Sequence, residues 1–333
     1  MDFRLDDDQR ALQAGMRQLL ERSFPRERLR EAVEVQGGKD AEAGVDRALW
    51  RALGDAGFFA LRLPEEDGGV GLGLPEAVLL FEEAGRALVP GPLVAMHLAA
   101  GLVPGAAEGA RMVTALAGPG MAEHLDAADS VLLLDGAKAR VSATDEGTGP
   151  RVLAARPVQS VDPLTPLHEV HRLPPFSATC LLPGGDGERL RNEAALLTAA
   201  QQLGSALRTL DLAVLHARSR RQFGRPIGAF QAVQHLCARM LVRAEIARSS
   251  VYAASLAMAA CDVAGAKLLA DEAAVRNARD CLQVHGGMGF TWDADVHLHL
   301  KRAWLRREQW RTPAVAEEEL AAELLAGDAY GAA

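Results

Sequence analysis

Arginines gather in one short segment of the sequence, where residue types and spacing point most directly to chemistry. The segment lies within a 333-residue chain of formal net charge −8, and its arginines are Arg218, Arg220, Arg221 and Arg225. A guanidinium group is a planar donor that matches the oxygens of phosphate and carboxylate groups. A basic cluster in an acidic chain therefore predicts a binding site for an anion.

Turn-forming residues interrupt a helical pattern at this segment. Gly224, Pro226 and Gly228 can end a helix and turn the chain, because glycine accepts a positive φ and proline cannot continue a helix interior. On both sides, apolar residues recur at intervals of three and four, as expected for one buried helix face. They are Leu196, Leu203, Leu207, Leu210, Val214 and Leu215 before it, and Val233, Leu236, Cys237, Met240, Leu241 and Ala244 after it. We therefore predict a corner between two long helices.

Two further segments are rich in glycine. One runs from Gln283 to Phe290 and reads QVHGGMGF, and the other runs from Leu63 to Gly73 and reads LPEEDGGVGLG. Together with the R-x-x-F-G-x-x-I-x-x-F-Q pattern of residues 220–231, they resemble three signatures of the acyl-CoA dehydrogenases, in the same order. Members of that family are flavoenzymes that introduce an α,β double bond into acyl-CoA thioesters. The resemblance implies an FAD cofactor, an acyl-CoA substrate and an electron-transfer acceptor.

At the arginine corner, the resemblance also implies individual contacts with the cofactor. Arg220 would pair with the FAD diphosphate, Phe223 would pack on the cofactor, and Gln231 would donate or accept a hydrogen bond. In the family these residues reach into the flavin site of a neighbouring subunit, which implies a homo- or hetero-oligomer, either a dimer or an α2β2 tetramer. A solvated helix end is the alternative for Arg220.

The glycine segment is assigned in the same way. By resemblance, Gln283 and the backbone of Gly286 and Gly287 approach the adenosine-diphosphate end of FAD. Glycines allow such an approach, because main-chain N–H groups can come close to an anion. A plain connection between helices is the alternative here.

The catalytic base is harder to place. The family's reaction needs a glutamate that removes a proton from the acyl α-carbon, and a carboxylate can do so only when desolvation raises its pKa. Counting from Gln283, the loop position that most members use for this glutamate is occupied by Trp310, with Glu308 nearby. Some members use an earlier helix instead, and there Glu193 lies one residue from the expected position. For either glutamate, a solvent-facing helix charge is the alternative.

The sequence pattern divides the chain into three domains. Residues 1–109 predict a helical domain, with a first helix over about residues 6–30. Residues 110–186 change to short β-like runs, including 131–134 and 139–141, separated by turn formers. Residues 187–333 return to long helices, which predicts a four-helix bundle. The predicted fold class is mainly α with a small, shortened middle β domain, as in the acyl-CoA dehydrogenases.

The middle domain departs from the family in two ways. It is short, and it lacks the tryptophan-containing strand that faces the flavin, since the tryptophans are Trp50, Trp292, Trp304 and Trp310. Together with the missing loop glutamate, this resembles the small subunit of heteromeric bacterial acyl-CoA dehydrogenases of lipid or steroid catabolism. We therefore expect a half-site subunit whose partner supplies the glutamate. The alternatives are a self-sufficient homo-oligomer that uses Glu193, and a degenerate member that binds acyl-CoA or a partner without redox chemistry.

Composition excludes several other classes. With 44 acidic and 36 basic residues, the chain is not expected to bind nucleic acid. The acidic N-terminus has no apolar core and no apolar run approaches about 18 residues, so neither a signal peptide nor a membrane helix is expected. The four cysteines have no paired spacing, which favours reduced thiols in the cytoplasm. His168 with His171 and His297 with His299 lack a third ligand, so no metal is expected.

Overall fold

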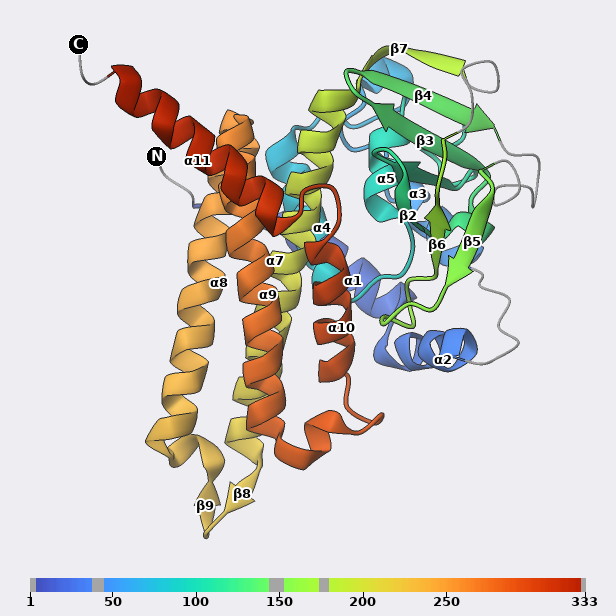
Figure 1. Cartoon of the computed structure of the whole chain (residues 1–333). Helices are drawn as coiled ribbons and strands as arrows, with labels where there is room; N and C mark the ends of the chain where they lie inside the picture. The colour runs from blue at the N-terminus through green and yellow to red at the C-terminus, as the bar shows by residue number, and fades with distance from the viewer. Residues whose placement is uncertain (1–3, 38–44, 144–152, 174–179, 331–333) are drawn as a thin grey trace. The chain divides into compact units, whose positions relative to one another are not determined.

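The structure is a computed structural model in which residues 4–37, 45–143, 153–173 and 180–330 are described. Helices dominate it (Figure 1). The α-helices are α1 (Asp7–Ser23), α2 (Arg26–Gly37), α3 (Arg47–Asp55), α4 (Leu74–Arg86), α5 (Leu93–Ala99), α7 (Gly187–Ser219), α8 (Gln231–Ala257), α9 (Ala260–His285), α10 (Val296–Arg307) and α11 (Pro313–Tyr330).

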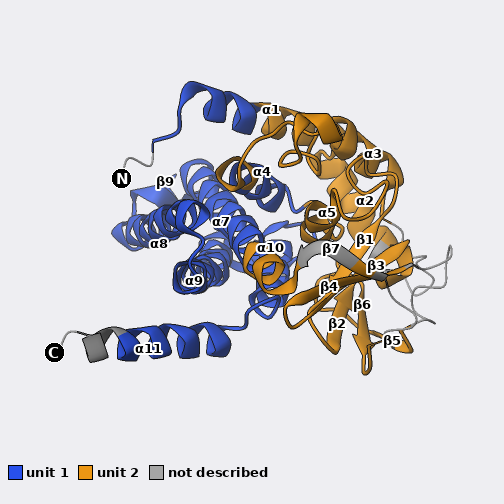
Figure 2. Cartoon of the chain, turned by 90° about the horizontal axis from the view of Figure 1, so that it is seen from above, with its two compact units in different colours: residues 1–14, 78–88, 195–333 blue, residues 15–77, 89–194 orange. Residues whose placement is uncertain are grey.

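The chain forms two compact units, coloured separately in Figure 2. One comprises residues 1–14, 78–88 and 195–333, and the other comprises residues 15–77 and 89–194. The division into domains 1–109, 110–186 and 187–333 stays a prediction. Among the described residues, none of the helices is both long and apolar enough to cross a membrane.

The first unit is a bundle of long helices whose buried faces contain many small residues. Helices α8, α10 and α11 each pack against α9 (Figure 1). The alanines of α9 that are fully buried include Ala264, Ala270, Ala273, Ala274 and Ala278. Small side chains let helix backbones approach closely, and larger residues fill the space between them. Leu210 of α7, Met240 of α8 and Leu282 of α9 belong to one buried cluster, which supports the ends of these helices.

Helices α4 and α7 cross closely within this unit. A Cβ atom on Gly85 would collide with the carbonyl oxygen of Gln201, and one on Gly204 would collide with the carbonyl oxygen of Glu82. Any larger residue at either glycine would push the two helices apart, so this crossing depends on glycine for space.

The second unit combines α2, α3 and α5 with two small sheets. The strands are β1 (Val113–Leu116), β2 (Gly120–Glu123), β3 (Ser130–Asp135), β4 (Lys138–Ala143), β5 (Ala155–Val158), β6 (Leu167–Val170) and β7 (Cys180–Asp186). One sheet has the order β1-β3-β4-β7, with β1 parallel to β3 and the other pairs antiparallel, and the second is an antiparallel β2-β6-β5 sheet. Val131 and Leu133 of β3 share a buried cluster with Leu116 and Val170.

Most elements lie where the sequence predicts them. The β-like runs at 131–134 and 139–141 are confirmed as β3 and β4, and helical structure returns at Gly187. The mainly α class with a small β part is thereby confirmed. The single helix predicted over residues 6–30 is wrong, because α1 ends at Ser23 and α2 begins at Arg26. The cause is Pro25, which has no N–H to donate and which instead accepts the first hydrogen bond of α2, from Leu29.

Candidate functional site

The arginine segment is a β-hairpin beyond the end of α7, at the lower tip of the view in Figure 1. Strands β8 (Arg221–Gln222) and β9 (Arg225–Pro226) pair antiparallel. Phe223 and Gly224 are the two turn residues, and both have positive φ values, 52° and 79°. A two-residue turn of this kind favours Asn and Gly over bulky residues. Phe223 nevertheless occupies it and is 89% exposed. A strained, exposed aromatic side chain is typical of a contact with another molecule.

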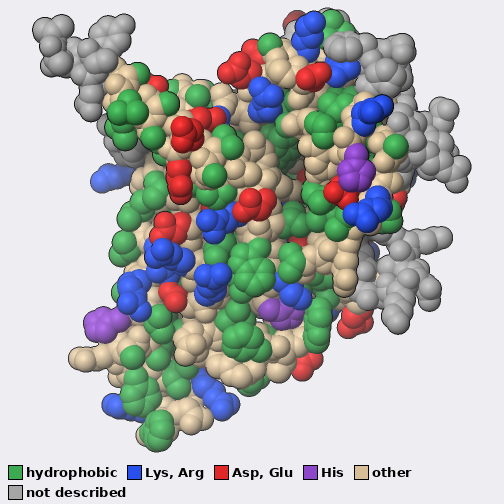
Figure 3. Space-filling model, viewed as in Figure 1, with side chains coloured by type: hydrophobic (Ala, Val, Ile, Leu, Met, Phe, Trp, Pro, Cys, Tyr) green, Lys and Arg blue, Asp and Glu red, His purple; other side chains and the backbone are tan. Residues whose placement is uncertain are grey.

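Two of the four arginines stabilise the hairpin itself. Arg221 donates from Nη2 to the carbonyl oxygen of Gly224, at 2.9 Å. The guanidinium of Arg225 lies 4.2 Å from the ring centroid of Phe230, in a cation–π contact. Figure 3 shows basic side chains beside hydrophobic ones at this tip of the molecule. These two arginines therefore have structural roles within the segment.

Arg220 is different, because its backbone is fixed while its side chain is available. Its N–H donates to the carbonyl oxygen of His216 and its carbonyl oxygen accepts from the N–H of Ile227, both at 2.8 Å. The side chain is exposed, and within the described part of the chain its guanidinium makes neither a hydrogen bond nor an ion pair. Gln231 is also exposed and opens α8, whose N-terminal dipole favours negative charge nearby. The geometry at this end of the bundle suits an anion.

The glycine segment forms a second corner, at the end of α9. Gly286 has φ 62° and ψ −143°, a conformation that is essentially restricted to glycine, and its N–H donates to the carbonyl oxygens of Gln283 and Leu282. A Cβ atom on Gly286 or Gly287 would meet nothing within 4 Å. At Gly287, therefore, none of the described residues demands the absence of a side chain. The exposed backbone leaves room for a bound molecule to approach.

A pair of histidines joins the two corners. The rings of His216, in the last turn of α7, and His285, the last residue of α9, are stacked with centroids 4.2 Å apart and planes inclined at 22°. His285 also holds its own helix end, with Nδ1 lying 2.8 Å from the carbonyl oxygen of Cys281. No sequence signal predicts this stack, because the two histidines are far apart along the chain and each looks like an ordinary helix-end residue.

Glu193, the candidate base, is buried in the unit formed by residues 15–77 and 89–194, as part of an ion-paired cluster. It is 4% exposed, so the alternative of a solvent-facing helix charge is wrong for this residue. Arg62 donates to both of its carboxylate oxygens, at 2.7 and 3.3 Å, and Arg189 donates to Oε1 at 2.6 Å. Burial raises the pKa of Glu193, but the hydrogen bonds and charges of Arg62 and Arg189 outweigh it and lower the pKa overall. This arrangement favours a permanent carboxylate over a proton acceptor.

The residues at the family's loop position lie at the end of α10. Glu308 is the C-cap residue of that helix and is exposed, and Trp310, two residues further on, has a positive φ of 62°. An exposed carboxylate is solvated by water rather than enclosed by the protein. Neither residue supplies a desolvated base in this chain.

A buried ion pair in the bundle was not anticipated. Lys267 and Asp271 of α9 are 0% and 2% exposed, with Nζ and Oδ2 2.5 Å apart. Lys267 also donates to the carbonyl oxygen of Arg306 at 3.1 Å, and Gln202 donates to Asp271 at 2.9 Å. Burial lowers the pKa of Lys267 and raises that of Asp271. The pair fixes the end of α10, and its i,i+4 spacing was the one signal available in the sequence.

The histidine pairs have other partners. His168 lies 3.1 Å from Asp126, His171 lies 3.7 Å from Glu169, and Ser205 Oγ lies 2.9 Å from Nδ1 of the buried His299. Among the described residues, no cluster of three His, Cys, Asp or Glu side chains is arranged to hold a metal ion.

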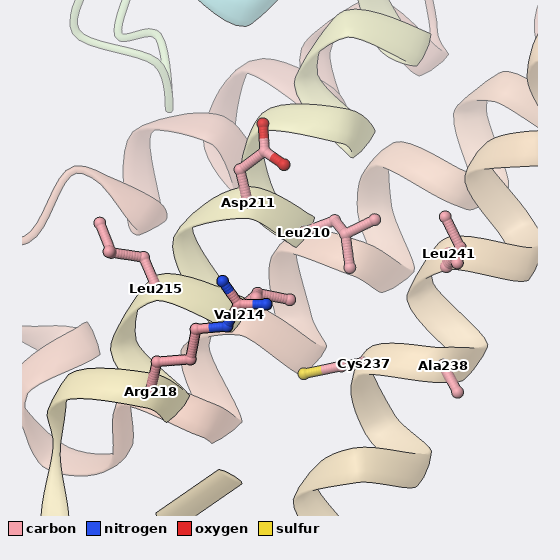
Figure 4. Close-up of a pocket in the computed structure, with 8 residues that line it drawn as sticks. All are labelled: Leu210, Asp211, Val214, Leu215, Arg218, Cys237, Ala238 and Leu241. Carbon is pink, nitrogen blue, oxygen red and sulfur yellow. The ribbon is translucent and has the colours of Figure 1, made fainter. Parts of the chain in front are cut away.

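A groove lies between α7 and α8, with a volume of about 480 Å³. Figure 4 shows the side chains that line it. They are Leu210, Asp211, Val214, Leu215, Arg218, Cys237, Ala238 and Leu241. Leu215 and Leu241 are 65% and 47% exposed, and Val242 and Ile246, further along α8, are 56% and 48% exposed. Exposed apolar side chains that line a groove are typical of an interface with another protein.

Comparison with known proteins places this geometry in a class of oxidoreductases. The family model for the acyl-CoA dehydrogenase N-terminal domain matches residues 6–110, and that for the C-terminal domain matches residues 188–308, which include both corners. The chain belongs to the acyl-CoA dehydrogenase family. It is 37% identical over 279 residues to the acyl-CoA dehydrogenase IpdE2 of Mycolicibacterium smegmatis, covering 81% of this chain and 85% of that protein.

Solved structures share the fold. A variant of the Tcur3481-Tcur3483 steroid acyl-CoA dehydrogenase is similar with a TM-score of 0.80 and 23% identity, over 97% of this chain and 99% of that chain. The ChsE4-ChsE5 complex from Mycobacterium tuberculosis is similar with a TM-score of 0.79 and 24% identity, over 98% of this chain and 99% of that chain. Membership of the family that the three signatures predict is confirmed by the family models and by IpdE2.

Proposed function

We propose that the chain takes part in FAD-dependent α,β-dehydrogenation of an acyl-CoA thioester, as a half-site subunit. In this role it lends contacts for the FAD diphosphate to a partner subunit that carries the catalytic glutamate. The observation that carries the proposal is the exposed guanidinium of Arg220 on a fixed backbone. A diphosphate is a multi-oxygen anion of the kind that a guanidinium binds with paired, charge-assisted hydrogen bonds.

The neighbouring residues fit the rest of the cofactor. Phe223 presents an exposed ring that can pack on the isoalloxazine or adenine system, and Gln231 can hydrogen-bond a polar edge. Gln283 and the open backbone at Gly286 and Gly287 suit the adenosine-diphosphate end. A bound FAD would supply the redox chemistry as acceptor of the β-hydride of the acyl group, and an electron-transfer acceptor would reoxidise the assembly. This chain's own contribution is to bind and orient the anion and to cover the cofactor with an apolar side chain.

The environments of Glu193 and Glu308 support the proposal that the partner subunit supplies the catalytic base. Abstraction of an α-proton needs a carboxylate whose pKa is near the working pH. Glu193 does not meet this requirement, because its two arginine partners lower its pKa and stabilise the charged carboxylate. Glu308 is exposed to water. We therefore assign proton removal to a glutamate of the partner subunit.

The apolar surface on α7 and α8 supports association with that partner. Two structures of similar fold are named by two components each, Tcur3481-Tcur3483 and ChsE4-ChsE5, and the first is named a steroid enzyme. By analogy, we propose an assembly of two kinds of acyl-CoA dehydrogenase subunit, such as an α2β2 tetramer. We propose that its acyl substrate belongs to lipid or steroid catabolism.

The visible absorbance spectrum of the purified protein tests the proposal. The chain is purified with FAD, alone and after co-expression with a full-length family member encoded nearby. We expect a flavin band only in the co-purified assembly, and we expect Arg220→Gln to remove most of it. The matched control is Arg239→Gln, which changes an exposed arginine of α8 that lies outside both the arginine segment and the lining of the groove.

Other outcomes identify the alternatives. A stoichiometric flavin band in the chain alone would favour a self-sufficient homo-oligomer and would overturn the half-site role. Acyl-CoA binding with no flavin in either preparation would favour a family member without redox chemistry.

A further inference from the structure

The contact between His216 and His285 connects the two segments of the proposed cofactor site. His216 is directly linked to the arginine corner, because its carbonyl oxygen accepts the backbone N–H of Arg220 at 2.8 Å. His285 is covalently joined to Gly286, the first glycine of the other corner. The ring-to-ring contact of 4.2 Å therefore lies between the candidate diphosphate ligand and the candidate backbone ligand.

The other polar contacts of the two corners are local. The arginine corner is held by hydrogen bonds from Arg221 to Gly224, within the hairpin, and from Gln234 to Gly228, in the turn that follows it. The glycine corner is closed by hydrogen bonds from Gly286 to the end of α9 and from Thr291 to Met288. Within the described residues, the polar contacts of each corner stay inside that corner. The histidine stack is a direct side-chain contact from one to the other.

The hydrogen bond of His285 and the environment of His216 favour this stack. The Cys281 carbonyl can only accept a hydrogen bond, so Nδ1 of His285 is the nitrogen that carries a proton in the neutral ring. Burial, followed by the charges of His285 and Arg220, lowers the pKa of His216. A lowered pKa favours the neutral ring of His216, so the stack does not set two imidazolium ions face to face beside the permanent charge of Arg220.

We infer that His216 and His285 are positioning residues, whose stacked rings set the separation of Arg220 from the Gly286–Gly287 backbone and thereby the affinity for the FAD diphosphate. The inference rests on the proposed function. It predicts an effect that is transmitted through Arg220, which a purely structural role in the helix bundle would not produce.

A double-mutant cycle on FAD binding tests the inference. The assembly with its partner subunit is prepared as wild type, His285→Ala, Arg220→Gln and the double variant, and the FAD dissociation constant is measured from flavin fluorescence. We expect His285→Ala alone to weaken binding about fivefold, as for loss of one aromatic contact. In the Arg220→Gln background the same change should have little further effect, because the ligand that the stack positions is already gone.

Two more variants separate positioning from folding. His285→Phe keeps a flat ring at the stack and should retain most of the affinity that His285→Ala loses. His235→Ala, an exposed histidine on α8, is the matched control and should bind FAD as the wild type does. Thermal unfolding and assembly with the partner are measured for every variant, and both should be nearly unchanged in His285→Phe.

The outcomes distinguish the inference from the function on which it rests. If the wild-type assembly binds no FAD, the proposed function fails and the inference fails with it. If the wild type binds FAD and His285→Ala binds it equally well, only the positioning role is overturned. Equal losses for His285→Ala in the wild-type and Arg220→Gln backgrounds would also overturn that role, because the effect would then bypass Arg220.

Discussion

Arg62 holds Glu193 with two nitrogens of its guanidinium, Nη1 to Oε2 at 2.7 Å and Nη2 to Oε1 at 3.3 Å. The carboxylate is nearly inaccessible, whereas Arg62 and Arg189 keep contact with water, with side chains 27% and 49% exposed. A buried acid with two cationic partners is an anchor for the first turns of α7. Its chemistry is that of a structural ion pair.

The first prediction concerns Glu193→Gln. The variant leaves two guanidinium groups without their anion and should lower the free energy of unfolding by about 2 kcal/mol, less than for a fully buried pair because both arginines are partly exposed. Turnover of the assembly with its partner should stay near that of the wild type. Denaturant unfolding and steady-state kinetics measure the two effects.

Glu188→Gln is the control, since Glu188 is an exposed glutamate on the same helix. The pH dependence gives a further check. Because the pKa of Glu193 is lowered on folding, the stabilisation is present above the ordinary glutamate value of 4.5 and is lost as the pH falls below it. A collapse of turnover with unchanged stability would instead identify Glu193 as a base.

The second prediction concerns His97, which is buried and lies 3.3 Å from the carbonyl oxygen of Phe58 through Nδ1. Burial, with the nearby charge of Arg62, lowers the pKa of His97 to about 4 from 6.5. Between pH 6.5 and pH 4, His97 is therefore protonated in the unfolded chain but neutral in the folded chain. The free energy of unfolding falls as the pH falls through this range. Between pH 7 and pH 5 the wild type should lose about 2 kcal/mol more than His97→Gln.

Unfolding curves at both pH values measure this difference, and His235→Gln, at an exposed histidine, should lose as much as the wild type. Equal losses in His97→Gln and in the wild type would show that His97 is not kept neutral by burial.

Local signals in the sequence account for what could be predicted. The spacing of apolar residues marks the long helices, and Gly224, Pro226 and Gly286 mark their ends, because each acts on the backbone near its own position. The hairpin within the arginine corner was missed, since its turn carries Phe223 where Asn or Gly is the usual signal.

Side-chain pairs between distant segments could not be predicted. Glu193 looks like one more helix charge until folding brings Arg62 against it, and His216 looks like an ordinary helix-end residue until His285 stacks on it. In both cases the partner is fixed by tertiary packing. Helical periodicity carries no information about such a pair. The sequence signatures therefore predict the flavin contacts, whereas the stack between His216 and His285 that supports them is visible only in the structure.

The third prediction concerns the buried pair of Lys267 and Asp271. Lys267→Met should destabilise the protein by about 3 kcal/mol or more, because Asp271 would remain buried without a cation. Adding Asp271→Leu should restore much of the loss, since two apolar residues need no partner. Arg276→Met is a matched control on the same helix, because its i,i+4 pair with Glu272 is exposed, and it should cost no more than about 0.5 kcal/mol. If Lys267→Met costs as little as this control, the pair does not hold α10.

The fourth prediction concerns the apolar surface of the α7–α8 groove. Leu241→Glu places a charge on this surface at a side chain that is already 47% exposed, so folding should be little affected. Association with the partner should weaken at least about tenfold, because the charge would be desolvated at an interface. Sedimentation velocity of the co-purified subunits measures this change. Val35→Glu, at a 60% exposed residue of α2, is the control, and equal association of both variants would place the interface elsewhere.

The fifth prediction concerns Phe223, where a substitution should change the free energy of unfolding and the affinity for FAD in opposite directions. A non-glycine residue with positive φ is strained, and Asn tolerates that conformation better than Phe, so Phe223→Asn should leave the chain as stable or about 1 kcal/mol more stable. The assembly should nevertheless retain FAD about tenfold less tightly, since the exposed ring that packs on the cofactor is gone. Phe223→Tyr keeps the ring and should bind FAD like the wild type. A gain in stability with undiminished FAD affinity would mean that the strain at this turn serves some purpose other than the flavin.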